Sequence, residues 1–500
     1  MKKFSGPIFS AALLALLLWA YTRHNNFPFY YHTDEPGKVE QVVSGKHNYR
    51  HPLLMINATD LVVRALKIDK VPQNVVLVGR WTSALAAVLA IAAVILIVRR
   101  HSDWWFGLLA GAMAGLHPFL FEATHYMKED CFLLAGLTWT WYALDRFCDS
   151  ESNASLVLAG IATGVAASAK YLGILALVFS IALLIFKMRR ATWSSINRKL
   201  ILLCSVYLLT FAIFDFQSVI HPLEALNGIG SEFIRINRDR TSGLLETNYF
   251  FRLVGHAGPL LVLGGLTYIG TFFGRREKKP LIERGLLIFA LAYLIGLCLT
   301  PLGKDRYLIP LATLLSIFTV WGTRSAASWI AERHPRFPQS TIAILACVVV
   351  IFAELPFVFL DEKEFAHDRR TQMVEWIRDH LPANAVIAHE ARIWPSRGPN
   401  DWRTQLPQRR VSPPFFSTTL KNIDNMKRLG ITHVIAAGSN YRRTVGEDHV
   451  SISGDSEFYN DLEKNGIVLW QVPHGRIEYL SPGLTVYAIP NSSAIHDVRP

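Results

Sequence analysis

Residues 75–98 read VVLVGRWTSALAAVLAIAAVILIV, an almost uncharged apolar run. A helix needs about 20 mostly apolar residues to cross the hydrocarbon core of a bilayer, which is roughly 30 Å thick. Comparable runs recur along the chain, and 51% of its 500 residues are hydrophobic. The pattern therefore predicts an integral membrane protein with many membrane-spanning helices.

Eleven segments have the apolarity expected of spanning helices. They are residues 7–21, 75–98, 104–121, 130–147, 156–169, 172–186, 200–220, 256–273, 285–301, 307–322 and 341–360. The first follows Lys2 and Lys3, as the apolar part of a signal peptide would. Because Trp19, Tyr21 and Arg23 stand where a small-residue cleavage site would lie, we expect a retained helix.

Lysine and arginine fall in the loops of one side if these segments alternate across the membrane. The basic positions are Lys2, Lys3, Arg99, Arg100, Lys187, Arg189, Arg190, Arg198, Lys199, Arg275, Arg276, Lys278, Lys279, Arg284, Arg324, Arg333 and Arg336. Short cytoplasmic loops are enriched in these residues. We therefore expect a plasma or inner membrane protein whose N-terminus is cytoplasmic and whose C-terminus is extracytoplasmic, in the periplasm of a Gram-negative cell. The net charge of +12 mostly reflects this bias, and we expect no nucleic-acid partner.

Three segments on the outer side are long enough to fold, namely residues 22–74, 221–255 and 361–500. In the first, Pro36 precedes valines at helical spacing, which favours a helix that begins there. Residues 51–64 carry an apolar face at helical spacing, which is typical of a helix that lies in the membrane interface.

The last 140 residues change in character and alternate short apolar runs with amphipathic stretches. Strands are predicted at residues 385–389, 433–437, 467–472 and 484–489, and helices at 369–381, 418–429 and 456–464. The predicted fold is thus a polytopic α-helical membrane protein, residues 1–360, with a C-terminal extracytoplasmic α/β domain, residues 361–500.

Ionisable residues collect at the predicted outer ends of several helices. Asp34 and Glu35 follow the first span, and the others are Lys128, Asp130, Lys170, Lys304, Arg306, Tyr307, Arg238, Arg240, His51, His125 and His256. Such groups are costly near a membrane unless they are paired or used. Together they could hold a phosphate and activate a hydroxyl.

The order and sidedness of these motifs resemble the GT-C glycosyltransferases over about residues 1–360. The motifs are the Asp34-Glu35 pair, His51-Pro-Leu-Leu, the charged turn before residue 130, and Arg306-Tyr-Leu-Ile-Pro310. The resemblance is to bacterial relatives of the protein O-mannosyltransferases and of the lipid A aminoarabinose transferases.

The resemblance implies sugar transfer from a polyprenyl-phosphate carrier to an acceptor hydroxyl at the outer leaflet, with inversion. Asp34 matches the family's catalytic carboxylate and would act as general base, with Glu35 beside it. Lys128 and Arg306, followed by Lys304, Arg238, Arg240 and Lys170, would bind the donor phosphate. His51, His125, Asp130, Tyr307 and His256 would shape the site or bind the acceptor, which is a glycan, a lipid or a protein. No cofactor is implied with certainty, and a divalent cation remains open.

Two other interpretations compete with this one. Asp34 and Glu35 are also suited to cap the helix that begins at Pro36, since acids are favoured at a helix N-terminus. A polytopic protein with charged helix ends could instead be a transporter or a lipid flippase. Transporters usually contain internal repeats and polar residues at mid-membrane, whereas here the ionisable residues gather at one side.

Overall fold

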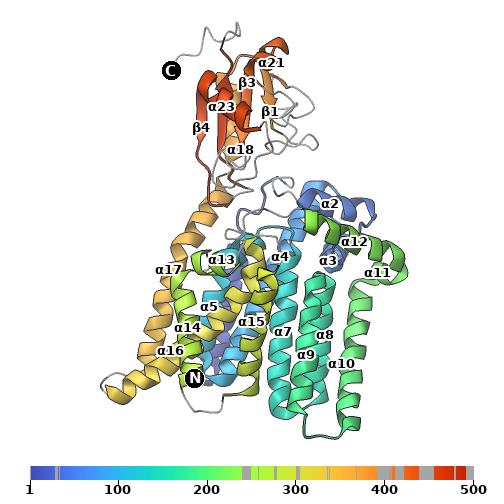
Figure 1. Ribbon diagram of the computed structural model, residues 1–500, viewed down its shortest axis with the longest axis vertical. Coiled ribbons are helices and arrows are strands. Elements are labelled where there is room, and N and C mark those ends of the chain that lie inside the picture. Colours follow the sequence, from blue (N-terminus) through green and yellow to red (C-terminus); the bar gives the residue numbers. More distant parts are fainter. Residues whose placement is uncertain are drawn as a thin grey trace. The chain divides into compact units, whose positions relative to one another are not determined.

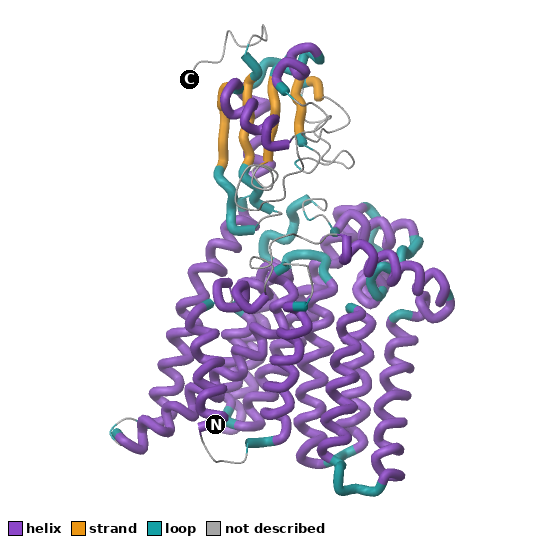
Figure 2. Tube along the Cα trace, viewed as in Figure 1, coloured by secondary structure: helices purple, strands orange, loops and turns teal. Residues whose placement is uncertain are grey.

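The computed structural model describes residues 2–28, 32, 34–238, 249–256, 258–274, 279–299, 304–334, 336, 338–367, 369–390, 393, 406, 408–410, 422–437, 455–477 and 480–490. The chain divides into two compact units. The first contains residues 1–25 and 37–359, and the second contains residues 26–36 and 360–500. The first unit is a bundle of helices, and the second is built around a β-sheet (Figure 1 and Figure 2).

Each predicted spanning segment overlaps a long helix in the described part of the chain, although residues 300 and 301 of the segment 285–301 lie outside it. These helices are α1 (Lys2–Thr22), α4 (Pro72–His101), α5 (Trp104–Gly115), α7 (Glu129–Ser150), α8 (Asn153–Ala169), α9 (Ile174–Lys187), α10 (Trp193–Phe214), α14 (Pro259–Gly274), α15 (Leu281–Cys298), α16 (Ile309–Arg333) and α17 (Gln339–Ala366). Among the described residues, six helices are long and apolar enough to cross a membrane, or up to eight if each of two bent pairs is one span. The structure thus gives a polytopic helical protein, and eleven crossings stay a prediction.

Shorter helices connect the long ones. They are α2 (Glu35–Ser44), α3 (Leu54–Ala65), α6 (Pro118–Thr124), η1 (Tyr171–Gly173), α11 (Phe216–Ile220), α12 (Pro222–Arg238), α13 (Tyr249–His256) and η2 (Asp305–Leu308). Helices α2, α3, α11 and α12 gather beyond the ends of α8–α10 (Figure 1). The N-terminus and the α9–α10 and α16–α17 connections lie at the opposite end, which we call the basic end because Lys187, Arg189, Arg190 and Arg336 belong to these connections.

Small residues let neighbouring helices of the bundle approach closely. A Cβ atom added to Gly136 of α7 would lie 2.5 Å from the backbone nitrogen of Ala166 in α8. One added to Gly164 of α8 would lie 2.5 Å from the side chain of Thr210 in α10. Close backbone approach through small residues is typical of helices that pack in membranes.

Three predicted spans differ from the helices that form. The segment 104–121 breaks between α5 and α6 with a bend of 66°, because Pro118 disfavours a helical conformation at His117. The segment 200–220 ends as a continuous helix at Phe214, before the polar residue Asp215. In the segment 256–273, helix α14 begins only at Pro259 and is bent by 112° from α13. Gly258, which lies between the two helices, has a φ of +86°.

The second unit holds five strands among its described residues, in the order β2-β1-β3-β5-β4. They are β1 (Val386–His389), β2 (Arg409–Arg410), β3 (His433–Ala437), β4 (Ile467–Val472) and β5 (Leu484–Ala488). Strand β1 is parallel to β2 and β3, whereas β5 is antiparallel to β3 and β4. The four predicted strands form, and β2 is an addition.

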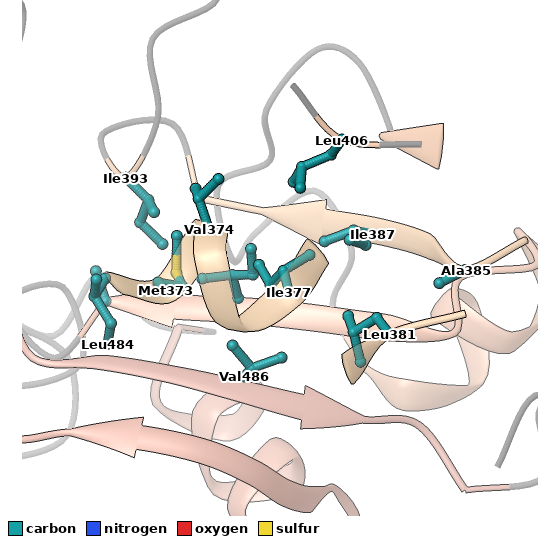
Figure 3. Packing of buried hydrophobic residues seen from close by; sticks show 12 residues of the cluster. Met373, Val374, Ile377, Leu381, Ala385, Ile387, Ile393, Leu406, Leu484 and Val486 are labelled. Atoms are coloured by element: carbon teal, nitrogen blue, oxygen red, sulfur yellow. The ribbon is translucent and has the colours of Figure 1, made fainter. Parts of the chain in front are cut away.

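Helices cover both faces of this sheet. On one face, α18 (Arg369–His380) packs Met373 and Ile377 against the strands (Figure 3). On the other, α21 (Ile423–Arg428) and α23 (Asp455–Asn465) pack Met426 and Phe458. Of the predicted helix 418–429, residues 418–421 lie outside the described residues. Neighbouring strand residues alternate between the two clusters, as the period of two in a strand requires.

Candidate functional site

The acidic pair lies at the start of α2. The backbone N–H of Asp34 donates to Nδ1 of His32 at 3.1 Å, and the N–H of Glu35 donates to the carbonyl of His32 at 3.1 Å. Glu35 is buried and Asp34 is half-buried. Both belong to the second unit, whereas α2 continues into the first from Gly37. A tight turn over His32 therefore fixes the backbone of the pair.

Lys38, in the first turns of α2, ties this helix to the start of α7. Its ammonium donates to the Glu129 carboxylate and, at 3.2 Å, to the carbonyl of Met127. Both Lys38 and Glu129 are buried. Loss of either partner would leave a buried charge without compensation, which is strongly destabilising.

A second buried ion pair lies next to it. Nζ of Lys170, in the turn between α8 and α9, is 2.7 Å from Oδ1 of Asp130. The same Nζ lies 4.2 Å from the centroid of the Tyr307 ring, which suits a cation–π contact. Burial lowers the pKa of Lys170 and the Asp130 carboxylate raises it, and the net shift is upward, so the ammonium stays charged at neutral pH.

Lys128 and Arg306 complete the cationic side of this region. The N–H of Lys128 donates to Oγ of Ser83 at 3.1 Å, and that hydroxyl lies 3.2 Å from the Lys128 carbonyl. The guanidinium of Arg306 lies 5.6 Å from the centroid of the Tyr307 ring. The charges of Lys128 and Arg306 both act on the Asp130 carboxylate. They therefore belong to the same electrostatic environment.

The η2 turn is held by the helices around it. The N–H of Lys304 donates to the Tyr249 hydroxyl of α13 at 3.1 Å. The Tyr293 hydroxyl of α15 donates to the Tyr307 carbonyl at 3.3 Å, and Arg252 of α13 pairs with Asp305 at 2.9 Å. These contacts fix the backbone on which Arg306 and Tyr307 stand.

His51 shares this environment. Burial lowers the pKa of His51, and the charges of Lys38 and Lys170 lower it further, whereas Glu129 and Glu232 raise it. The net shift is downward, so the imidazole is neutral at pH 7. A neutral imidazole both donates and accepts hydrogen bonds.

We call these residues the polar cluster: Lys38, His51, Lys128, Glu129, Asp130, Lys170, Arg306 and Tyr307. It holds four cations and two carboxylates, and His51 is neutral. The carboxylates and most of the cations are buried, so water screens their charges only weakly. Lysine and arginine are the usual partners of phosphate oxygens. The cluster thus has the residue types that bind a phosphate.

The other predicted site residues lie elsewhere or outside the description. His125 is buried, and its Nδ1 lies 2.8 Å from the carbonyl oxygen of Phe121. Burial lowers the pKa of His125 to about 3. Arg238 and His256 end α12 and α13, but their side chains lie outside the described residues, as does the whole of Arg240. The described contact of Lys304 is the hydrogen bond from its backbone N–H to the Tyr249 hydroxyl.

Sequence reasoning missed Lys38 and Glu129 as members of the site. Lys38 follows the acidic pair within the same short motif, and Glu129 stands between the selected Lys128 and Asp130. The local charge pattern was thus visible, but the partners are 91 positions apart in sequence. Tyr249 and Ser83 carried no signal, since each lies in an ordinary apolar context.

In the described part of the chain, no three histidine, cysteine, aspartate or glutamate side chains group as a metal site requires. The need for a divalent cation therefore stays open, as in the sequence analysis.

Residues 68–214 match a protein family described as dolichyl-phosphate-mannose-protein mannosyltransferase. The matched stretch runs from just before α4 to the end of α10 and includes Lys128, Asp130 and Lys170. No curated protein sequence matches the chain.

Two solved structures share the fold over nearly the whole chain. ArnT from Cupriavidus metallidurans, solved bound to undecaprenyl phosphate, has a TM-score of 0.51 and 15% identity, and the match covers 97% of this chain and 98% of that one. The oligosaccharyltransferase of Archaeoglobus fulgidus, solved in complex with Zn and sulfate, has a TM-score of 0.53 and 14% identity. That match covers 95% of this chain and 73% of the other.

Proposed function

We propose that this chain is a GT-C-type glycosyltransferase related to the protein O-mannosyltransferases, and that it transfers a sugar from a polyprenyl-phosphate donor to an acceptor hydroxyl at the outer leaflet. The observation that carries the proposal is the polar cluster, in which four cations face two carboxylates at one end of the bundle. Four lysine and arginine side chains in one place suit the phosphate of such a donor better than they suit a neutral or cationic solute.

The cluster would stabilise the leaving phosphate. Lys128 and Arg306 are the first candidates, followed by Lys170, Lys304, Arg238 and Arg240. Lys170 is paired with Asp130, so an arriving phosphate would compete with that carboxylate for the ammonium. A preorganised donor aimed at a developing negative charge typically contributes about 10²–10³ in rate.

Asp34 would be the general base. In this step the acceptor hydroxyl gives its proton to Asp34, the acceptor oxygen bonds to the anomeric carbon, and the bond from that carbon to the phosphate oxygen breaks. Polyprenyl phosphate leaves as a stable anion, so no second carboxylate need donate a proton, unlike in glycoside hydrolysis. Attack opposite the leaving group inverts the anomeric centre. Asp34 directly precedes α2, the helix that carries Lys38, which supports this assignment.

The proposal includes eleven crossings, a cytoplasmic N-terminus and an extracytoplasmic unit that begins near residue 360. The basic end shared by the N-terminus and two connections supports this topology. The sugar, the acceptor and the need for a divalent cation are left to experiment.

The test is to incubate the purified protein with a panel of polyprenyl-phosphate sugars and measure which one is consumed. Asp34→Asn should stay folded and lose transfer by about 10²–10⁴, the usual contribution of a general base. Glu35→Gln should keep measurable activity. Full activity in Asp34→Asn would remove the base assignment, and transport of the lipid without a new glycosidic bond would favour the flippase.

A further inference from the structure

A polar cavity of about 530 Å³ lies in the first unit, between residues 41–64 and helices α11 and α12. Its lining residues are Gln41, Val42, Gly45, Lys46, His47, Tyr49, Ile56, Asn57, Asp60, Arg64, Gln217, His221 and Glu224. None of these belongs to the polar cluster. Its volume is within the range of roughly 300–1,000 Å³ that is typical of small-molecule sites.

The cavity is next to the polar cluster. The Tyr171 hydroxyl donates to the carbonyl of the lining residue Tyr49 at 3.0 Å, and Tyr171 directly follows Lys170 of the cluster. Helix α2 contributes Lys38 to the cluster and Gln41 to the cavity. A molecule in the cavity would therefore lie beside the cations proposed to hold the donor.

Specific contacts hold the walls together. The Asn57 amide of α3 donates to the Phe214 carbonyl at 2.8 Å and to Oε1 of Gln217 at 3.0 Å. Helix α12 approaches the backbone of Tyr49 so closely that a Cβ added to Gly228 would lie 2.6 Å from it. The cavity is thus built by contacts between separate elements.

The lining is polar but balanced in charge. Lys46 and Arg64 are its cations, and Asp60 and Glu224 are its carboxylates. Asp60 already pairs with Arg64 at 2.6 Å and with Lys70 at 2.8 Å. Glu224 lies 3.6 Å from His221. The lining itself therefore has as many carboxylates as lysine and arginine side chains.

What the cavity offers is neutral hydrogen-bonding groups and rings. The amides of Gln41, Asn57 and Gln217 line it, and the His47 and His221 rings flank Tyr49 at centroid distances of 6.1 and 6.5 Å. Nδ1 of His47 is buried and has no hydrogen-bond partner among the described residues. Burial lowers the pKa of His47, and the charge of Asp60 only partly offsets this, so the ring is neutral at pH 7.

We infer that this cavity binds a neutral saccharide, and, resting on the proposed function, that this saccharide is the acceptor. The three amides, the neutral His47 ring and the Tyr49 ring match a ligand that presents many hydroxyls and no charge. The His47 nitrogen gains a hydrogen-bond partner when such a ligand binds.

The test is to measure, by calorimetry, the binding of neutral methyl glycosides and short oligosaccharides to the purified full-length protein. No polyprenyl-phosphate sugar is present in this measurement. We expect saturable binding, with His47→Ala weakening the affinity about tenfold, which is the effect of about 1.4 kcal/mol. His47→Gln, which keeps a hydrogen-bonding group, should recover part of the loss. Leu61→Ala, on the exposed face of α3 and outside the lining, is the matched control and should change nothing.

Absence of saturable binding to every neutral saccharide would overturn the inference. So would equal affinities of the wild type and His47→Ala, or a preference for glucose 6-phosphate over the neutral sugars. The binding measurement needs no donor, so it tests saccharide binding in the cavity even if no polyprenyl-phosphate sugar is consumed. Donor consumption by the wild type tests the proposed function separately.

Discussion

Both ends of the helical unit bury charged residues, but a carboxylate is the centre of the contacts at one end, whereas several cations gather at the other. At the basic end, Asp145 of α7 lies 2.5 Å from Nε of Arg100 and 2.9 Å from Nε2 of His101. Arg324 of α16 donates to the His101 carbonyl at 2.9 Å, and Tyr268 donates to Glu283 at 2.9 Å. These contacts join α4, α7, α14, α15 and α16.

At the basic end, Asp145 pairs with both Arg100 and His101, Glu283 accepts from Tyr268, and Arg324 donates to a backbone carbonyl. The polar cluster instead brings four cations together with two carboxylates. A network centred on a carboxylate joins helices, whereas several cations gathered in one place suit an anionic ligand. The difference teaches that burial of charge alone does not identify a site, and that the kind of charge gathered there has to be considered as well.

The largest expected effect comes from breaking one ion pair at each end. Lys170→Met removes the ion pair of the buried Asp130 carboxylate, which typically costs about 3–5 kcal/mol of unfolding free energy. Asp145→Ala should cost less, because Arg100 is partly exposed and keeps its pair with Asp149. Only Lys170→Met should also weaken donor use. Stability is measured by thermal unfolding in detergent, and donor use by the KM for the polyprenyl-phosphate sugar.

The double variant Lys170→Met with Asp130→Asn is the control for this comparison. It removes both charges, so it should recover much of the stability but not the donor affinity. If Asp145→Ala weakened donor use as much as Lys170→Met, the proposed division of roles between the two ends would be wrong.

A smaller effect is expected from Arg306→Ala. Arg306 is half-buried, so its loss should change stability little, whereas donor turnover should fall by about 10²–10³ if it stabilises the leaving phosphate. Arg333→Ala at the basic end, where the guanidinium stacks on Trp329, is the matched control. Unchanged donor kinetics in Arg306→Ala would remove this residue from the phosphate site.

The smallest effect is a pH dependence at Asp215, which joins α10 and α11 to α3. Its Oδ1 accepts from the Leu53 N–H at 3.3 Å and from Ser218 at 2.9 Å, and burial raises its pKa to about 6. Between pH 4 and 6 the folded state thus holds a proton that the unfolded state releases. This contribution to stability should be lost as the pH rises to 6 and stay constant above it.

Asp215→Asn keeps the amide oxygen as an acceptor and removes the titration. The difference in unfolding midpoint between the wild type and this variant should therefore change between pH 4.5 and 7. A difference that is constant over this interval would show that Asp215 does not titrate there.

Helix positions were predictable because apolar runs report burial in a membrane directly. The runs do not report where a helix bends, so residues 216–220 were assigned to a span although Asp215 interrupts the helix. Gly258 likewise gave no sign that its φ of +86° would accompany a sharp bend. Local conformation at a single residue decides both cases.

The candidate site was predictable in residue type but not in pairing. Lys128, Asp130, Lys170, Arg306 and Tyr307 were chosen as charged or polar residues at helix ends, and the structure brings them together. The Lys38–Glu129 pair depends on how α2 meets α7, which no local pattern encodes. Asp34 remains the proposed base.

The peptide groups of helix α7 add an electric field to the polar cluster, in addition to the charges of the side chains. Its first residues are Glu129 and Asp130, so its N-terminus opens into the cluster. The aligned peptide groups of a helix place about half a positive elementary charge at that end. Peptide groups do not titrate, so this part of the attraction for a phosphate would persist at any pH and in any lysine or arginine variant that leaves the helix intact.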